Sequence, residues 1–435
     1  MNMNSIIYLY KPKYKRKVIK IMILNIKIQN IKNKSKKING ITLIALVITI
    51  ILLLIFAGVS ISALTGQNGL LKMVSEASEK TEVSTNEEKR KLAQIEALTS
   101  TTDIIYNGVI IPKGFAPTKI SGEDSVDVGL VITDENGNEY VWVEVSKSIY
   151  ENTIYNSNNI NKPSSSTDYE KIESCLKSYT SDYKNEKYSD INPEFLSLYQ
   201  NMLKSVYENG GFWIGRYEAG LEEGKAPRTE YTAIQKNDTF VIKPNMYPYN
   251  FLKRDDAQSL ATNMNHDNCT SSLLFGLQYD LVFKYIETKM IIKDPEIKTK
   301  LIFDSTPLGN YFNSEFTLNR GKFAHFDALS DWYEFNKDDL SGLVKESKKI
   351  AQSNRSNAII LTTGAAEVSK LQNIYDIAGN VWEWTLEFYN TDDPCVIRVG
   401  GIDKSGLERP SIFRAPYNTG NWSGVFGFRI GVWKQ

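Results

Sequence analysis

The stretch Asp376-Ile-Ala-Gly-Asn-Val-Trp-Glu-Trp384 places one glutamate between two tryptophans, directly after a glycine–asparagine pair. A tryptophan is costly to leave in water, and an ionised carboxylate is costly to bury. Alternation along an extended strand directs Trp382 and Trp384 to one side and Glu383 to the other. The sequence therefore predicts a strand whose tryptophans enter the core and whose glutamate needs a partner.

The charge of the chain is balanced overall but unevenly distributed. Its 435 residues, enough for one large domain or two or three average ones, include 51 basic and 51 acidic residues. The first forty residues hold ten lysines, one arginine and no acid, so the remainder carries a formal charge of −11 (0 − 11). A main body that is acidic argues against nucleic-acid binding.

The segment Ile41–Leu64 contains no charged residue and follows a basic run. As a helix it would span about 36 Å, which exceeds the ~30 Å hydrocarbon core of a membrane. Basic residues on its N-terminal side predict a single-pass membrane protein whose C-terminal domain is extracellular. A buried core helix is rarely so long and uniform, and the apolar region of a secretory signal peptide is usually shorter.

The junction between the basic run and this segment, Lys36-Lys-Ile-Asn-Gly-Ile41, resembles the type IV prepilin cleavage and methylation signal. The resemblance implies that a prepilin peptidase cuts between Gly40 and Ile41, that the new amino terminus is methylated, and that the pilus machinery of a bacterial cell surface is a partner. Ala45 stands where that family usually has a glutamate that pairs with a neighbouring subunit, so filament assembly would lack this contact.

The chain thus divides into four expected segments. They are a leader at 1–40 (shorter if translation starts at Met22 instead of Met1), a transmembrane helix at 41–64, a helical stalk or linker at 65–103, and a head at 104–435 with an insertion at 151–191. Apolar residues recur at helical spacing in the stalk, with an interruption expected near Thr85 and Asn86. The alternative for 65–103 is a disordered spacer.

Short strands, helices and irregular stretches predict an α+β head and not a sandwich or a Rossmann sheet. Turn residues at 134–138 separate two valine-rich runs, which predicts a β-hairpin. Asn192 and Pro193 predict a helix start, and further helices are expected near 255–264 and 272–287.

Three motifs occur in order near the C-terminus: Asp376–Trp384, Arg398-Val-Gly-Gly401 and Gly427-Phe-Arg-Ile-Gly431. This series resembles the formylglycine-generating enzyme, or sulfatase-modifying factor, family over about residues 106–435. The resemblance implies a C-type-lectin-like α+β fold on the stalk and membrane helix.

The same resemblance implies a calcium site in the first motif. Its ligands would be the carboxylates of Asp376 and Glu383 and the backbone carbonyls of Gly379 and Val381, which suits the preference of Ca²⁺ for oxygen. The alternative is a metal-free turn in which an arginine such as Arg398 holds Glu383.

The enzymes of that family use copper or iron, and this sequence is not equipped for either metal. No cysteine lies between Gly400 and Arg429, where a copper-binding pair is expected; Ser411 occupies that region and Cys395 precedes it. Two histidines, His266 and His325, cannot provide an iron-binding cluster. We therefore expect no catalytic residues, no copper and no iron. His266 with Asp267 and Cys269 could form a small metal site, although a solvated loop is the commoner arrangement. Because the chain has three cysteines, Cys175, Cys269 and Cys395, at least one is unpaired or bonds another chain.

The segment between Gly401 and Gly427 corresponds to a recognition surface in lectin-like domains. It contains aromatic, arginine and amide side chains typical of binding surfaces: Arg414, Tyr417, Asn418, Asn421 and Trp422. Alternatively, Arg414 and Trp422 support the fold. The function expected first is a surface-displayed binding or adhesion module for a glycan, peptide or cell-wall polymer. A minor pilin and an enzyme with divergent chemistry are the alternatives.

Overall fold

The computed structural model describes residues 70–435 except 151–162, 265–267, 316–317, 319 and 335–357. The expected leader and transmembrane helix, including Gly40 and Ile41, lie outside the described residues. The chain forms two compact units, Met1–Val83 and Ser84–Gln435. Among the helices that the structure describes, none combines the length and apolar character that crossing a membrane requires.

Helix α3, Leu70–Thr99, is continuous, without the interruption expected near Thr85 and Asn86. Its last turns belong to the second unit, where Ala93 and Ala97 are buried in one cluster with Ala116. Arg90 donates to both carboxylate oxygens of Glu123, at 2.8 and 3.1 Å. This part of the helix is therefore packed against the head.

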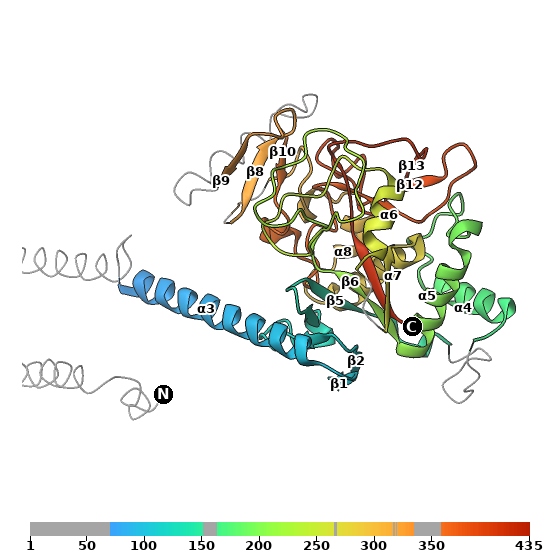
Figure 1. The fold of residues 1–435 in the computed structure, drawn as a ribbon, viewed down its shortest axis with the longest axis horizontal. Coiled ribbons are helices and arrows are strands. Elements are labelled where there is room, and N and C mark those ends of the chain that lie inside the picture. Colours follow the sequence, from blue (N-terminus) through green and yellow to red (C-terminus); the bar gives the residue numbers. More distant parts are fainter. Residues whose placement is uncertain (1–69, 151–162, 265–267, 316–317, 319, 335–357) are drawn as a thin grey trace, which may run out of the picture. The chain divides into compact units, whose positions relative to one another are not determined.

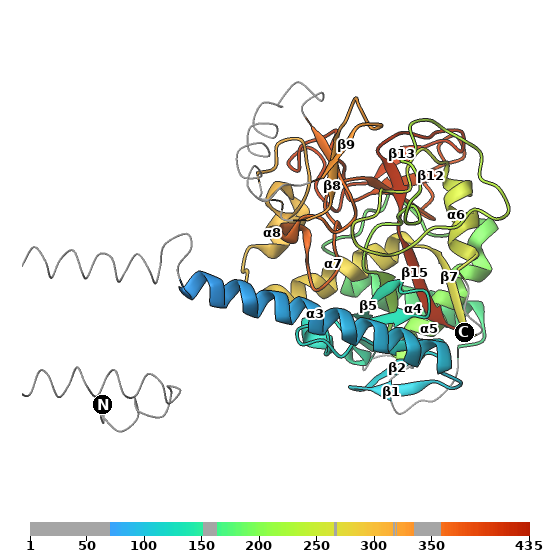
Figure 2. The same cartoon turned by 60° about the vertical axis from the view of Figure 1, so that its left-hand side comes forward.

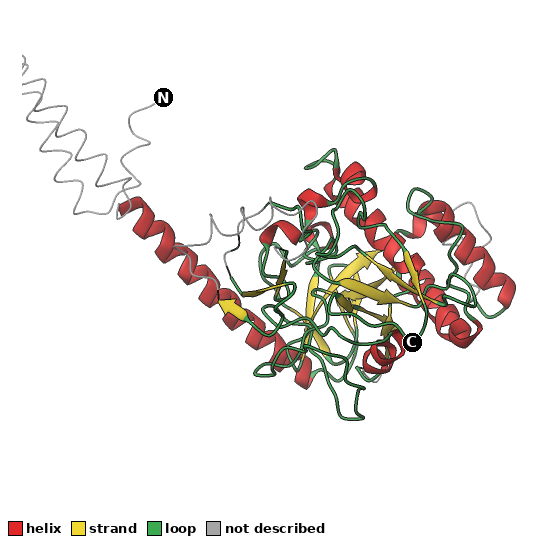
Figure 3. Ribbon diagram, turned by 90° about the horizontal axis from the view of Figure 1, so that it is seen from above, coloured by secondary structure: helices red, strands yellow, loops and turns green. Residues whose placement is uncertain are grey.

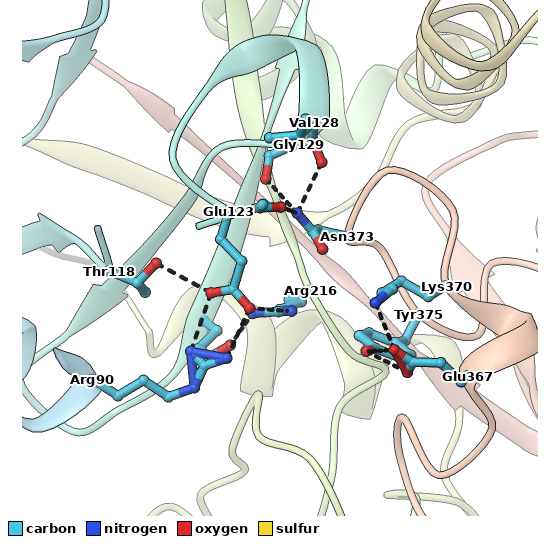
Figure 4. A network of polar contacts seen from close by, with 12 residues as sticks. Arg90, Thr118, Glu123, Val128, Gly129, Arg216, Glu367, Lys370, Asn373 and Tyr375 are labelled. Atoms are coloured by element: carbon cyan, nitrogen blue, oxygen red, sulfur yellow. Dashed lines mark hydrogen bonds and ion pairs between the residues drawn. The ribbon is translucent and has the colours of Figure 1, made fainter. Parts of the chain in front are cut away.

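A network of buried charges reinforces this attachment (Figure 4). Arg216 contacts Glu123 at 2.8 Å and Glu139 at 2.7 Å, and Arg90 approaches Glu139 at 3.2 Å. Burial raises the pKa of Glu123, but the guanidinium groups of Arg216 and Arg90 outweigh it, and the pKa is lowered overall. Two arginines and two glutamates thus stabilise each other in this network.

The main sheet of the head has six strands in the order β3-β4-β5-β6-β15-β7, and all neighbours are antiparallel. The strands are β3 (Phe115–Pro117), β4 (Val131–Asp134), β5 (Glu139–Glu144), β6 (Gly211–Gly215), β15 (Ile430–Lys434) and β7 (Cys269–Leu273). The pairing of β4 with β5 confirms the predicted hairpin. The last strand, β15, lies between β6 and β7 and so joins β7 to the rest of the sheet (Figure 2).

A four-stranded sheet in the order β13-β12-β11-β14 brings the three C-terminal motifs together. Its strands are β11 (Trp382–Thr385), β12 (Cys395–Arg398), β13 (Ala415–Tyr417) and β14 (Phe426–Phe428). Glu383 on β11 lies opposite Arg398 on antiparallel β12 and opposite Gly427 on parallel β14.

Two smaller sheets complete the strands that the structure describes. One pairs β1 (Ile104–Tyr106) with β2 (Val109–Ile111), and the other has the order β10-β8-β9, formed by Ile359–Leu361, Lys322–His325 and Trp332–Glu334.

Helices surround the strands of the head (Figure 3). They are α4 (Ser166–Tyr179), α5 (Leu196–Asn209), α6 (Arg254–Thr262), α7 (Gly276–Met290) and α8 (Ile297–Ile302), with short 3-10 turns at Val126–Val128, Lys147–Tyr150, Pro193–Phe195, Thr306–Leu308 and Glu367–Ser369. Helix α5 packs on β6 and β15, and α4 packs on α5 (Figure 1). The predicted α+β class is confirmed.

Sequence signals locate several helix ends. The Asn192 side chain accepts the Glu194 N–H before α5, and Gly210, with a φ of 77°, ends that helix. Helix α7 begins at Gly276 and not near 272, because residues up to Leu273 belong to β7.

Most buried apolar side chains form one core that includes Trp213, Trp384 and Trp433.

Candidate functional site

Glu383 is held by an arginine and a tyrosine. Its Oε1 accepts a hydrogen bond from Arg429 Nε at 2.9 Å and forms an ion pair with Nη2 at 2.8 Å. Its Oε2 accepts the Tyr279 hydroxyl. Burial raises the pKa of Glu383, although the Arg429 charge opposes this effect. The partner is thus Arg429 of the third motif. The arginine expected as an alternative, Arg398, lies opposite in the backbone register but directs its side chain elsewhere.

Both flanking tryptophans are buried, as predicted, and their indole N–H groups are satisfied. Trp384 donates to the Leu252 carbonyl at 3.0 Å, and Trp382 donates to Asp403 Oδ1 at 2.7 Å. Buried indoles usually need such a partner. The tryptophans are therefore part of the framework of the head.

The remaining carboxylates of the first motif are also bound by protein donors. Asp376 Oδ2 accepts the Gly364 N–H at 2.6 Å, and Oδ1 accepts the Ser369 hydroxyl at 2.7 Å. The neighbouring Glu218, which sequence reasoning missed, accepts the Asn380 amide at 2.7 Å and the Val381 N–H at 3.1 Å. Its pKa is raised well above the ordinary value, by burial and then by the charges of Asp376 and Glu383.

The resemblance assigns the groups of this motif to calcium, but in the structure they have protein partners. The four carboxylate oxygens of Asp376 and Glu383 already accept hydrogen bonds, and the cation beside Glu383 is Arg429. Gly379 has a φ of 74° and packs on the Asn310 backbone, while Val381 donates its N–H to Glu218. The geometry matches the metal-free alternative. Within the described part of the chain, no three acidic, histidine or cysteine side chains are grouped to hold a metal. Calcium binding and its metal-free alternative both stay predictions, which differ in the expected effect of calcium on thermal unfolding.

The predicted binding surface divides into a buried and an exposed part. Arg414 is buried, donating to both oxygens of Asp280 at 2.7 and 2.8 Å and to Glu387 at 3.0 Å. This burial corrects the expectation of an exposed Arg414 and agrees with its alternative role in supporting the fold. Tyr417 is half-buried and packs edge-on against Trp384.

The exposed part is a small aromatic surface around Trp422, whose surface is 45% exposed. Its ring stacks on Tyr231 at 5.6 Å with an interplanar angle of 19°, and Phe251 lies 6.2 Å away. We call Tyr231, Phe251 and Trp422 the Trp422 platform. Lys253 Nζ lies 4.7 Å from the centre of the Tyr231 ring, a cation–π arrangement that braces the platform.

The loop beside the platform is ordered by its own amides. The Asn421 Oδ1 accepts the Asn418 N–H, and the Asn418 Oδ1 accepts the Gly420 N–H, each at 3.0 Å. Asn418 is exposed and Asn421 half-buried. Three of the five predicted surface residues, Asn418, Asn421 and Trp422, therefore gather at one exposed loop.

Ser411 and the three cysteines, which were considered above for metal binding or disulfides, have no ligand-binding arrangement among the described residues. The Ser411 hydroxyl lies 2.9 Å from that of Ser305. Cys175, Cys269 and Cys395 are free thiols, and burial raises the pKa of Cys269 to about 12 and that of Cys395 to about 11. His266 lies outside the described residues.

A cavity of about 510 Å³ opens beside the hairpin turn and the end of α6. Asp134, Glu222, Asp238 and Lys243 are among its lining residues. Asp134 is committed to the turn, since its Oδ1 accepts two backbone N–H groups at 2.9 Å. These residues come from segments far apart in the chain, so no sequence motif pointed to this cavity.

No model of a known protein family matches this sequence, and no curated protein matches it. The likeness to prepilins and to the sulfatase-modifying factor family therefore rests on the quoted motifs.

Proposed function

We propose that this protein is a membrane-anchored, surface-displayed binding module whose head, of the C-type-lectin-like sulfatase-modifying-factor type, binds an extracellular glycan, peptide or cell-wall polymer. The observation that carries the proposal is Trp422, a large aromatic side chain that is half exposed on an ordered loop. The anchor and its prepilin-type processing at Gly40 and Ile41 belong to the same proposal.

The surroundings of Trp422 favour binding over a role in the core. Burying a large apolar side chain contributes about 1.5–3 kcal/mol, so covering the exposed half of Trp422 would contribute about 1 kcal/mol. Its stacking on Tyr231 fixes the ring before a ligand arrives, which lowers the entropy lost on binding. Asn418 and Asn421 add hydrogen-bonding groups beside an aromatic anchor, the usual composition of a binding hot spot.

The test is a pull-down of the full-length chain in detergent with insoluble bacterial cell walls and with immobilised glycans. Trp422→Ala should reduce binding about fivefold, the equivalent of about 1 kcal/mol. Phe303→Ala is the matched control, because Phe303 is an exposed aromatic residue, 65% accessible, that is not part of the platform. Equal loss in both variants, or none in Trp422→Ala, would exclude the platform as the binding surface.

A different observation favours the second candidate, a minor pilin subunit. Leu92, Ile95 and Leu98 recur every three residues on α3 and are 59%, 57% and 65% exposed. Exposed apolar residues along one side of a helix are typical of a helix that packs against another subunit.

The mass of the mature amino terminus, measured in membrane and sheared surface fractions, separates the two candidates. A methylated Ile41 terminus in the sheared fraction supports the pilin subunit. A processed chain confined to membranes supports the anchored binding module. An uncut chain confined to membranes would make the segment a plain signal anchor and would remove the processing from the proposal.

A further inference from the structure

A small cavity of about 40 Å³ lies where the segment 183–190 meets the first turn of α7. Asp190, Asp280, Glu387 and Arg414 line its inner part, while Lys184 and Glu186 are exposed at its mouth. A water molecule needs about 10–15 Å³ of such space, so a group of ammonium size fits. Neither the binding platform nor the three C-terminal motifs account for this cavity.

The charges around the cavity do not balance. Arg398 contacts Glu387 at 2.6 Å and Asp280 at 3.0 Å, and Arg414 contacts the same two carboxylates. These two arginines face three buried carboxylates, because Asp190 also lines the cavity. The two lysines that line the cavity, Lys177 and Lys184, have carboxylates of their own, Glu173 and Glu186, at 2.6 Å each. With these pairs set aside, three buried carboxylates face two arginines, which leaves one excess negative charge.

The hydrogen bonds show where this charge lies. Glu387 Oε1 receives both guanidinium groups, but Oε2 has no hydrogen-bond partner among the described residues, although the side chain is only 2% exposed. Among the described residues, the donors to the Asp190 carboxylate are neutral: the backbone N–H groups of Gly276 at 2.6 Å and Leu277 at 3.0 Å. A buried carboxylate oxygen without a donor is costly, so this site lacks a donor with a positive charge.

We propose that this cavity binds a primary ammonium group, whose N–H donors reach Glu387 Oε2 and Asp190. An ammonium group carries one positive charge and three donors, which matches one unbalanced charge and two acceptor groups. Gly276 is needed for the site, since a Cβ at this position would collide with the Glu387 carboxylate.

A proton on Asp190 competes with this ligand. Burial, and then the nearby Glu387 charge, raise the pKa of Asp190 to about 7. Below pH 7 this proton supplies the missing positive charge, and an ammonium ligand must displace it. The affinity for ammonium therefore falls about tenfold for each pH unit below 7. The charged and titratable groups around Asp190 are Lys177 and Glu173 on α4, Lys184 and Glu186 at the mouth, Tyr199 on α5, Asp280 on α7, and Glu387, Arg398 and Arg414.

The test is calorimetric titration of the full-length chain in detergent with methylammonium chloride, at constant ionic strength. We expect saturable binding at pH 8, about tenfold weaker binding at pH 6, and no binding of tetramethylammonium, which is larger and has no N–H donor. Binding of Nα-acetyl-lysine amide as well would identify a lysine side chain as the ligand; its failure beside methylammonium would identify a small free amine. Equal binding of methylammonium and tetramethylammonium would overturn the proposal.

Variants identify the acceptors. Asp190→Asn keeps an oxygen for the α7 N–H groups but removes the charge, and should weaken methylammonium binding at least about tenfold and abolish its pH dependence. Glu387→Gln should weaken it similarly. Asp182→Asn is the control, because Asp182 is 42% exposed and pairs with Lys298. If Glu387→Gln does not fold, Asp190→Asn decides: unchanged affinity and pH dependence would rule out the site.

Discussion

Replacing Arg429 with methionine should remove much of the stability of the head. Arg429 is fully buried and neutralises Glu383, and it also donates to the carbonyls of Gly215 and Tyr375 at 2.8 Å each. Breaking a buried ion pair costs about 3–5 kcal/mol, and each unsatisfied carbonyl costs about 1 kcal/mol more. The expected loss of at least about 5 kcal/mol is comparable with the whole stability of many domains, about 5–15 kcal/mol.

Urea unfolding of the full-length chain in detergent, followed by tryptophan fluorescence, measures this loss. Lys298→Met is the control: the Lys298 pair with Asp182 is 37% and 42% exposed and should contribute less than about 1 kcal/mol. In the double variant Arg429→Met with Glu383→Gln no uncompensated charge is buried, so it should be more stable than Arg429→Met alone. A loss below about 1 kcal/mol for Arg429→Met, or additive losses in the double variant, would refute the reasoning.

Three further outcomes are expected. Calcium and chelator should give indistinguishable thermal unfolding midpoints, because Arg429 and Tyr279 already occupy the Glu383 carboxylate; a higher midpoint in calcium would support the metal site instead. Arg90→Met should cost about 1–2 kcal/mol and increase hydrogen exchange in residues 84–99, whereas unchanged exchange would show that its contacts with Glu123 and Glu139 do not hold the helix. Burial raises the pKa of Asp190 from 3.8 to about 7, so between these pH values the folded state binds more protons than the unfolded state, and the free energy of unfolding falls as pH rises. Asp190→Asn should remove up to about 4 kcal/mol of that fall. If the free energy of unfolding of the two proteins changed in parallel with pH, the assignment would be contradicted.

Turns and helix starts could be predicted from the sequence, because they depend on residues that are close together in the chain. The turn residues at 134–138 gave the hairpin of β4 and β5, and Asn192 with Pro193 gave the start of the helical region that includes α5. The isolation of Glu383 between two tryptophans predicted a buried charge with a partner. These signals act within a few residues, where turn and capping preferences are strong.

The partners across the fold could not be predicted in the same way. Arg398 and Arg429 are both compatible with Glu383 in sequence, and the parallel pairing of β11 with β14 places Arg429 nearest. Arginine is usually an exposed residue, but Arg414 is buried because it forms ion pairs with Asp280 and Glu387, which come from other segments of the chain. Asp190 lies in a segment that carried no site signal, because its role depends on α7 and Glu387 arriving from elsewhere.

The charged attachment of α3 has a mechanical consequence. In a protein anchored at its N-terminus, a ligand that pulls on the head applies tension to the last turns of α3. One guanidinium group, that of Arg90, contacts two carboxylates, Glu123 ahead of β4 and Glu139 on β5. Tension is therefore divided between a point on the main sheet, at β5, and a point on the turn between β3 and β4, so that no single edge strand has to resist it alone.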